Sequence, residues 1–437
     1  MTLTIVLAAI TCAAVICLVL LKPSVTVKGH KISIYWTPAL VGAISLVACG
    51  SADIKFVFDG LTADTAVNPL KILVLFISMT LLSVYLDEVG FFRYLATAAL
   101  KHAGQNGLAL FTVLYFVVGA LTVVTSNDII VLTFSPFICY FAKNAKINPL
   151  PYLIGEFVSA NTWSMALIIG NPTNIFLATG AGADFASYAL KMVFPTVFAG
   201  ITAYLVLLAL FAKELKKDKI TVDTAVIHVE DKTGLIIGLV HLIGCTALLV
   251  VASYIKLEMW YICLAFAGSL FFCVAIHHLI HKETPKELKG CLKRAPWELI
   301  PFVLSMFVIV LALEKNGICA ILGDFLSKGD DVFAYGAGAY LASNVINNIP
   351  ASVLFESIFA SPGQTAESSV YAAIIGTNVG AYLTPVGALA GIMWSGILAR
   401  HEIKFGFGKF VLYGTAVSLP TLAAALGGLE LSFVLFG

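Results

Sequence analysis

The sequence predicts an all-α polytopic membrane protein in which two repeats of inverted topology supply about ten transmembrane helices and two re-entrant hairpins. The first observation is composition. Hydrophobic residues make up 60% of the 437 positions and charged residues only 12%, against roughly 25% charged residues in a soluble domain. The mean hydropathy is +0.97. The second observation is a set of polar breaks inside long apolar segments, at corresponding places in both halves. Together they predict bilayer-crossing helices that are interrupted near the membrane midplane.

Ten apolar segments predict the transmembrane helices, since a helix needs about 20 mainly apolar residues to cross the hydrocarbon core. In the first half we expect spans at residues 3–21, 33–50, 70–86, 150–181 and 187–212. In the second half we expect them at residues 234–254, 259–280, 297–313, 366–399 and 408–436. The segments 150–181 and 366–399 each contain a polar break, so both are predicted to be interrupted helices.

Two further apolar segments turn on polar residues at their centres and predict re-entrant hairpins. Residues 107–142 turn at Ser126-Asn127-Asp128, and residues 333–360 turn at Ser343-Asn344. Because each hairpin enters and leaves on one side, each half has an odd number of crossings and the second half is inverted. The predicted domains are a first repeat over residues 1–213, a cytoplasmic linker over residues 214–233 and a second repeat over residues 234–437.

Basic residues predict the orientation of the chain in the membrane. Lysine and arginine gather in the loops at residues 22–31, 213–232 and 281–296, whereas the intervening loops are mainly acidic. This alternation requires re-entrant hairpins and places the basic loops in the cytoplasm and both termini outside. A net charge of +1 gives no field that would draw a nucleic acid. The expected partner is the lipid bilayer, and the expected location is a plasma membrane, the inner membrane of a bacterium.

Polar residues inside the breaks recur in register between the two halves. Asn127 and Asn344 lie 217 positions apart, and so do Asn161 and Asn378. Amides at membrane depth are costly unless they line a cavity, and interrupted helices in corresponding places indicate the substrate site of a secondary transporter. The alternative is that these residues only cap helix ends. The candidate substrate-binding residues are Ser126, Asn127, Asn171, Thr173, Asn174, Ser343, Asn344, Asn347, Asn348, Asn378 and Thr384.

Glycine and proline mark the breaks themselves. Proline removes a backbone donor and frees a carbonyl in the preceding turn, and helix ends at the hairpin tips supply unpaired N–H groups. Such ends would offer donors to an oxygen-rich solute and carbonyl oxygens to a cation. The predicted helix breaks are Gly170, Pro172, Pro350, Pro385 and Gly387.

Asp128 has no counterpart in the second half, where Val345 takes its place. A lone carboxylate at membrane depth is expensive to keep, which indicates that it binds the coupling ion, either a proton or sodium. The alternative is an N-cap for the second arm of the hairpin. Glu156 and His241 are expected to pair with neighbouring helices, and Glu356 is expected to be solvated towards the outer end of its hairpin arm.

The sequence carries no motif for cofactor or metal chemistry. No zinc, P-loop or nucleotide motif occurs, so we expect no cofactor, no resident metal and no enzymatic activity. The nine cysteines are scattered without a C-x-x-C pattern and are expected to pack as small apolar residues. Arg93, Arg294 and Arg400 are predicted at membrane edges. The lack of arginine near the breaks favours a neutral polyhydroxyl solute, or an anion held by helix ends and cations.

These motifs resemble the ion transporter superfamily and, within it, the arsenical pump membrane permeases. The resemblance spans nearly the whole chain and is strongest in Asn347-Asn348-Ile349-Pro350-Ala351 and in residues 375–390 and 394–410; Ser126-Asn127-Asp128 also resembles that family's first hairpin turn. It implies an inverted-repeat fold with a scaffold part and a transport part. It also implies export of arsenite or antimonite against proton entry, by the permease alone or with a separate soluble ATPase. Whether the protein forms a homodimer is left open.

One motif departs from this pattern. Gly170-Asn171-Pro172-Thr173-Asn174-Ile175 is more similar to the sodium–carboxylate and related anion transporters of the same superfamily. Two transport hypotheses follow: proton-coupled efflux of arsenite, antimonite or a similar small oxyacid, and sodium- or proton-coupled transport of a carboxylate or inorganic anion. Arsenite is an uncharged trihydroxide at neutral pH, which suits a site rich in amides, and Cys139 could offer it sulfur. A third hypothesis, a membrane scaffold that moves nothing, gives no reason for polar breaks in both halves.

Overall fold

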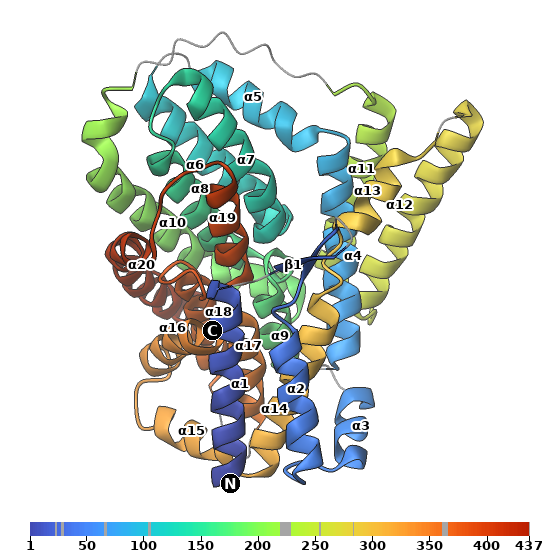
Figure 1. Ribbon diagram of the computed structural model, residues 1–437, viewed down its shortest axis with the longest axis vertical. Helices are drawn as coiled ribbons and strands as arrows, with labels where there is room; N and C mark the ends of the chain where they lie inside the picture. Colours follow the sequence, from blue (N-terminus) through green and yellow to red (C-terminus); the bar gives the residue numbers. More distant parts are fainter. Residues whose placement is uncertain are drawn as a thin grey trace.

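The computed structural model describes residues 1–21, 24–27, 30–64, 68–103, 106–218, 229–252, 255–282, 284–360 and 366–436. Within these ranges the chain is α-helical apart from two turns of 3-10 helix and one antiparallel pair of strands (Figure 1). The strands, β1 (Ser24–Val27) and β2 (His30–Ser33), follow the first helix, where we expected a loop. Apart from this pair, the predicted all-α membrane fold is confirmed.

The first half places the predicted hairpin in α6 and α7 and the first interrupted helix in α8 and α9. Two 3-10 turns, Ser164–Ala166 and Ile168–Gly170, separate α8 from α9. The helices are α1 (Thr2–Leu21), α2 (Thr37–Ala48), α3 (Ile54–Thr62), α4 (Pro69–Glu88), α5 (Phe91–Ala103), α6 (Gly107–Val124), α7 (Asn127–Ala145), α8 (Leu150–Trp163), α9 (Pro172–Gly180) and α10 (Phe185–Leu215).

The second half places its hairpin in α16 and α17 and its interrupted helix in α18 and α19. Between α18 and α19, residues 381–388 form turns rather than a helix. The helices are α11 (Lys232–Val251), α12 (Met259–His281), α13 (Lys286–Arg294), α14 (Leu299–Lys315), α15 (Ile318–Leu326), α16 (Phe333–Ile346), α17 (Asn348–Ala360), α18 (Glu367–Gly380), α19 (Leu389–Arg400) and α20 (Phe407–Phe436).

Seven segments among the described residues are long and apolar enough to cross a membrane. Six of them overlap predicted spans, and the seventh, α6, is an arm of the first hairpin. Helix α2 is shorter than its predicted span: its 12 residues extend about 18 Å, against a hydrocarbon core of about 30 Å. The seven segments are Pro69–Glu88, Gly107–Val124, Phe185–Leu215, Lys232–Val251, Met259–His281, Lys286–Lys315 and Phe407–Phe436.

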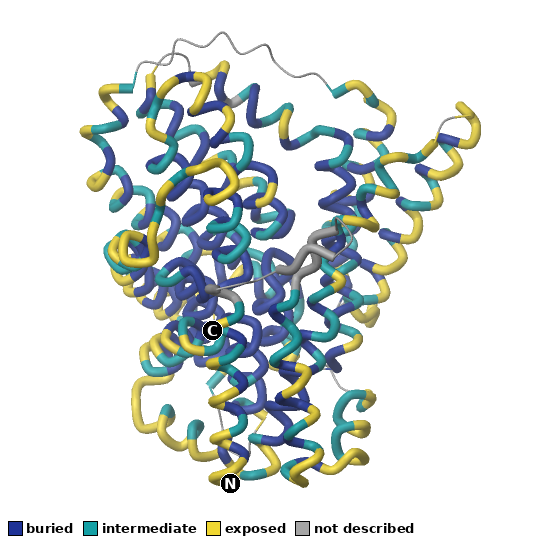
Figure 2. The backbone as a smooth tube through the Cα atoms, viewed as in Figure 1, coloured by how far each residue is buried: buried dark blue, intermediate teal, exposed yellow. Residues whose placement is uncertain are grey.

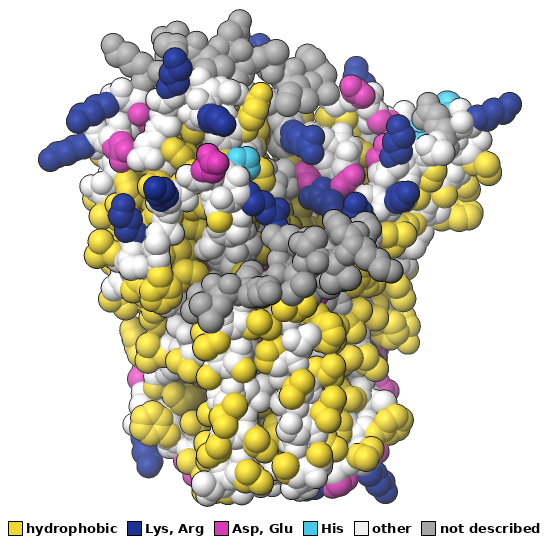
Figure 3. All heavy atoms as spheres, viewed as in Figure 1, with side chains coloured by type: hydrophobic (Ala, Val, Ile, Leu, Met, Phe, Trp, Pro, Cys, Tyr) yellow, Lys and Arg dark blue, Asp and Glu magenta, His cyan; other side chains and the backbone are white. Residues whose placement is uncertain are grey.

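Charged side chains lie at the two ends of the molecule, and hydrophobic side chains form a belt between them (Figure 3). On the face shown, lysine and arginine gather at the upper end, where α5 and α13 lie. By the positive-inside rule, the expectation stays that the upper end is cytoplasmic. Residues 22–23, 28–29, 219–228 and 283 of the basic loops lie outside the described residues, so the predicted linker 214–233 is seen only at its ends.

The helices pack into two parts. The scaffold part consists of α1, α2, α4, α11, α12 and α14. In it, α4 of the first half packs on α12 of the second half, and α14 of the second half packs on α2 of the first. The transport part consists of both hairpins, both interrupted helices, α10 and α20. In it, each hairpin packs on the interrupted helix of the other half: α7 packs on α19, and α17 packs on α9. Figure 2 shows buried residues concentrated inside the transport part, whereas α11 and α12 are exposed along much of their length. Exposed apolar faces of this kind suit contact with lipid.

Candidate substrate site

The tip of the first hairpin, between α6 and α7, ends in buried oxygen atoms that lack partners among the described residues. Ser126 occupies the N-cap position of α7, yet its hydroxyl makes no capping bond and has no other partner. Asn127 Nδ2 donates to Asn161 Oδ1 at 3.0 Å, but Asn127 Oδ1 accepts no bond. Leaving a buried polar group unpaired costs about 1–3 kcal/mol. Helix capping alone therefore does not account for this tip.

The tip of the second hairpin holds a strained backbone. Asn347, between α16 and α17, has φ +75° and ψ +153°, a region that glycine favours and that costs other residues about 1–3 kcal/mol. Hydrogen bonds hold it there: Asn347 Nδ2 donates to the Val386 carbonyl at 2.9 Å, and Asn347 Oδ1 accepts from the Ile349 amide at 3.3 Å. The backbone N–H of Asn348 donates to the Gly387 carbonyl at 3.0 Å, while the side-chain oxygen Asn348 Oδ1 has no partner among the described residues.

Asn344 links the second hairpin to the break between α18 and α19. Its Nδ2 donates to the carbonyls of Tyr340, at 2.8 Å, and Gly380, at 3.1 Å. Its Oδ1 accepts from the Thr384 hydroxyl at 2.7 Å. Ser343 lies beside it and bonds only within its own helix, to the Ala339 carbonyl. The second tip and the second break therefore form one hydrogen-bonded unit.

Asn378, on α18, joins the two halves of the chain at the centre of the transport part. Its Oδ1 accepts from Asn171 Nδ2 and from Ser164 Oγ, both at 3.0 Å. Its Nδ2 donates to Asn174 Oδ1 at 2.7 Å and to the Ile374 carbonyl at 2.8 Å. Because all its polar bonds are buried and satisfied, Asn378 acts as a structural hub between the first break and α18.

The first break is shaped by Asn171-Pro172-Thr173-Asn174. Asn171 Oδ1 caps α9 by accepting from the Thr173 amide at 3.2 Å, and Pro172 takes the first helical position, where its missing donor costs nothing. Asn174 Nδ2 donates to the carbonyls of Ser164 and Leu167. The Thr173 hydroxyl approaches Asn174 Oδ1 at 3.5 Å. Capping and network formation therefore coexist in this break.

Gly170 is required by a close backbone approach, which gives a testable expectation. A Cβ added there would lie 2.2 Å from the Ser164 carbonyl oxygen, so Gly170→Ala should displace the break and destabilise the protein by about 1–3 kcal/mol, the usual cost of overpacking. Gly268, in the middle of α12, has open space for a Cβ, so Gly268→Ala is the matched control. Thermal unfolding in detergent should show a lower midpoint for Gly170→Ala only; equal midpoints would show that the break tolerates a side chain.

A cavity of about 460 Å³ reaches the first hairpin tip. Ser126 and Asp128 line it from α7, Thr80 and Phe76 from α4, and Ile392 from α19. Asp128 is partly exposed to this cavity and bonds to no side chain that the structure describes. Because α4 belongs to the scaffold part and α7 and α19 to the transport part, the cavity lies on the boundary between the two.

Arginine lines the outer wall of the same cavity, which corrects the expectation that no arginine approaches the site. Arg294 and Arg400 end α13 and α19, and tertiary packing brings both ends to the cavity. Arg294 is neutralised by Asp87, at 2.5 Å, and Glu88, at 2.7 Å. Arg400 is exposed and forms no ion pair with any described residue.

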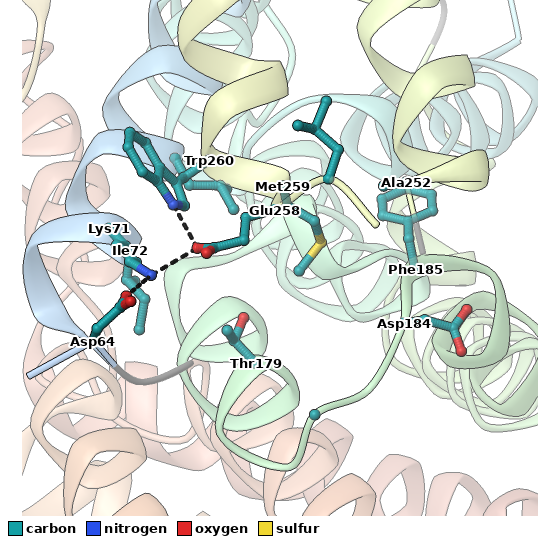
Figure 4. A pocket seen from close by; sticks show the side chains of 13 residues that line it. Asp64, Lys71, Ile72, Thr179, Asp184, Phe185, Ala252, Glu258, Met259 and Trp260 are labelled. Atoms are coloured by element: carbon teal, nitrogen blue, oxygen red, sulfur yellow. Dashed lines mark hydrogen bonds and ion pairs between the residues drawn. The ribbon is translucent and has the colours of Figure 1, made fainter. Parts of the chain in front are cut away.

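A second cavity, of about 450 Å³, lies on the same boundary at the other end of α4 (Figure 4). Lys71, from the first turn of α4, binds Asp64 at 2.6 Å and Glu258 at 2.8 Å, and the Trp260 indole donates to Glu258 at 2.7 Å. The hydrogen bond from Lys71 lowers the pKa of Asp64. Thr179, at the end of α9, faces these scaffold residues from the transport part.

The structure groups the predicted site residues into three clusters rather than around one cavity. Ser126 and Asp128 line the cavity at the first tip, whereas Asn127, between them in the chain, bonds to Asn161 and does not line it. Asn171, Thr173, Asn174 and Asn378 form the central network, whereas Ser343, Asn344, Asn347, Asn348 and Thr384 lie in or beside the unit of the second tip; none of these nine residues lines that cavity. Sequence reasoning did not place Asn161 in the site, although its register with Asn378 was a usable signal.

Four other polar residues take definite places. Glu356 is only 9% exposed, so its expected solvation is wrong: α17 turns it inward toward α9 and a cavity of about 230 Å³. Glu156 accepts from Ser135 on α7 at 2.9 Å, and His241 contacts Ser269 on α12 at 3.1 Å, so both pair with neighbouring helices as predicted. Cys139 is buried in α7 and, among the described residues, has no sulfur neighbour.

Comparison with known proteins gives one consistent result. The sequence profile of the citrate transporter (CitMHS) family matches residues 30–376. An arsenical pump membrane protein of Escherichia coli is 30% identical over 385 residues, covering 82% of this chain and 86% of that protein. A second one, from Escherichia coli strain K12, is 28% identical over 429 residues, covering 92% and 95%.

The fold has a solved counterpart. The crystal structure of the YdaH transporter of Alcanivorax borkumensis is similar with a TM-score of 0.54 and 13% identity, covering 99% of this chain and 98% of that one. The matched profile and the relatives are those of transporters, which favours a transporter over the hypothesis of a membrane scaffold that moves nothing. This chain is therefore a multi-pass membrane transporter that belongs to the citrate transporter (CitMHS) and arsenical pump membrane protein family.

Proposed function

We propose that this transporter exports arsenite, antimonite or a similar small neutral oxyacid in exchange for entering protons. The observation that carries the proposal is the first hairpin tip, where an accessible cavity meets Ser126 and a single carboxylate, Asp128. An uncharged trihydroxide both donates and accepts hydrogen bonds, so it can satisfy the unpaired Ser126 hydroxyl that lines this cavity. The arsenical pump membrane proteins among the relatives support this substrate.

The charges around the cavity favour a neutral solute over a multiply charged anion. The cavity is lined by two basic residues, Arg294 and Arg400, and by two acidic residues, Asp128 and Glu298, so their formal charges sum to zero. Arg294 is in addition bound to two carboxylates outside the cavity lining. A site for a citrate-like anion would need arginine free to grip carboxylates bidentately, and Arg294 does not meet that need.

Two cavities on one boundary support alternating access. The first lies between α4 and α14 of the scaffold part and α7 and α19 of the transport part; the second lies between α4 and α12 and the α9–α10 connection. Their positions at opposite ends of α4 suit a transport part that moves along the scaffold part and exposes its site to each side in turn. The central network of Asn378 would let both halves of the transport part move as one body.

A carboxylate or inorganic anion is the second candidate, coupled to sodium or protons. It is favoured by Gly170-Asn171-Pro172-Thr173-Asn174, by the citrate transporter profile and by the exposed Arg400 in the cavity wall. A separate soluble ATPase, a homodimer and a place in a bacterial inner membrane stay predictions.

Transport assays separate the two candidates. Expression in an arsenite-sensitive bacterium that lacks its own export system should restore growth on arsenite and lower intracellular arsenic relative to the empty vector. Uptake of labelled citrate, succinate and sulfate, with and without sodium, should equal the vector control. Unchanged arsenite sensitivity together with sodium-dependent citrate uptake would overturn the proposal in favour of the second candidate.

Both hairpin tips should affect arsenite transport, but by different routes. Asn127→Ala and Asn344→Ala should each weaken it about two- to twelvefold, because a neutral hydrogen bond contributes about 0.5–1.5 kcal/mol: Asn127→Ala alters the first tip itself, whereas Asn344→Ala loosens the unit that joins the second tip to the second break. Ser395→Ala is the matched control, since that hydroxyl bonds only to the Gly391 carbonyl of its own helix. The measurement is the concentration of arsenite at half-maximal transport; parental values for both asparagine variants would place the site elsewhere.

A further inference from the structure

Three sulfur atoms meet inside the scaffold part, away from both hairpins. The Cys245 Sγ of α11 lies 3.9 Å from the Cys263 Sγ of α12 and 3.7 Å from the Met79 Sδ of α4. Cys245 and Cys263 are fully buried and Met79 is 4% exposed. The remaining buried cysteines, Cys139, Cys291 and Cys319, have no such sulfur neighbour among the described residues. The cluster joins residues from three helices, and the transport mechanism does not use it.

The spacing fits one soft ion held by both thiols. Metal–thiolate bonds are about 2.3 Å long in zinc sites, so two of them span at most about 4.6 Å, more than the 3.9 Å between the two Sγ atoms. Thiolate and thioether ligands select soft ions. We propose that Cys245 and Cys263, with Met79 as a third sulfur, form a binding site for trivalent arsenic or antimony. The choice of this ion class rests on the proposed function.

The binding step is balanced without a redox partner. The two thiols replace two hydroxyls of the neutral trihydroxide: two arsenic–oxygen bonds break, two arsenic–sulfur bonds form, and each thiol proton leaves with a hydroxyl as water. The product is a neutral bis-thiolate of arsenic that keeps one hydroxyl. No charge is created in the apolar interior, where a bare thiolate would be costly to bury.

The cluster lies behind the wall of the cavity at the first hairpin tip. Met79 precedes Thr80 on α4, and Thr80 lines the cavity while Met79 contacts Cys245 on α11. An ion bound there would tie α11 to α12 within the scaffold part and leave the hairpin tips free. The site is therefore a scaffold site that is distinct from the transport site and acts on the fixed part of the molecule.

Arsenic content and arsenic spectroscopy of the purified, reduced full-length protein test this site, with sodium arsenite as the probe. After desalting, about one arsenic atom should remain per chain, and X-ray absorption should show sulfur neighbours around it. Cys245→Ser and Cys263→Ser should each lower the retained arsenic about tenfold or more, whereas Cys139→Ser and Cys291→Ser should retain it. Met79→Leu should keep the arsenic with one sulfur neighbour fewer.

Three results would overturn the site, and each comes from folded protein. The first is that the parent retains no arsenic, and the second is that its arsenic has only oxygen neighbours. The third is that both the Cys245→Ser and the Cys263→Ser variant retain the arsenic. Failure of the proposed function can be told apart from failure of this site. If the protein does not export arsenite, the proposed function is wrong, but the spectroscopic result still decides whether the site exists. If the protein exports arsenite but retains no arsenic, only this site is refuted.

Discussion

Asp128→Asn is expected to abolish proton-driven accumulation of the solute while leaving the protein folded. Asparagine has the size of aspartate but carries no exchangeable carboxyl proton, and Asp128 has no side-chain partner among the described residues whose loss would unfold the tip. One coupled charge contributes about 2.3 kcal/mol per 100 mV of membrane potential. At a membrane potential of about 100 mV, the loss of this charge should therefore lower the steady-state solute gradient by about fiftyfold. The measurement is solute accumulation under an imposed proton gradient.

Glu298→Gln is the matched control, because Glu298 is the other carboxylate in the lining of the same cavity. It should keep gradient-driven accumulation, and Asp128→Glu should keep part of it. Solute exchange without a gradient should continue in Asp128→Asn. Full accumulation by Asp128→Asn would remove this carboxylate from the coupling step.

Asn378→Ala is expected to destabilise the transport part and to stop transport. The substitution leaves Asn171 Nδ2 buried without its partner, at about 1–3 kcal/mol for an unpaired group, and leaves Asn174 Oδ1 with only the long contact to the Thr173 hydroxyl. The thermal midpoint of the purified protein should fall, and transport should fall with it because the two halves of the network separate.

Thr122→Ala is the matched control, because it removes a buried hydrogen bond that lies outside the central network. The Thr122 hydroxyl is buried but bonds only to the Val118 carbonyl within α6. Its removal should change the midpoint little. An Asn378→Ala variant as stable as Thr122→Ala and fully active would show that the central network does not join the halves.

Local signals in the sequence were sufficient to predict the long apolar helices and the polar turns, though not the strand pair or the shortness of α2. Long apolar runs predicted α4, α10, α11, α12, α14 and α20, because crossing a membrane requires uninterrupted hydrogen-bonded helix. Polar turns at Ser126-Asn127 and near Asn344 predicted both hairpins. Proline and glycine predicted the breaks, and the structure places Pro172 at the first position of α9 and Pro350 in the first turn of α17. These features depend on neighbours within a few residues.

Long-range packing could not be predicted in the same way. Asn378 bonds with partners 204, 207 and 214 positions away, and only the register of Asn161 with Asn378 hinted at a shared centre. Arg294 reaches the cavity because α13 ends beside α4, a tertiary contact that no local pattern records. Glu356 is buried because α17 packs on α9. The sulfur cluster joins three helices, and nothing in its spacing marks it.

The measurement that tests the central claim most directly is solute movement in proteoliposomes that contain only this protein. With sodium absent and an imposed proton gradient, labelled arsenite should accumulate on the side from which protons leave, and Asp128→Asn and Asn127→Ala should reduce that accumulation in parallel. Labelled citrate should distribute as in protein-free vesicles. Sodium-driven accumulation of citrate, with arsenite unmoved by the proton gradient, would contradict proton-coupled oxyacid export at the first hairpin tip.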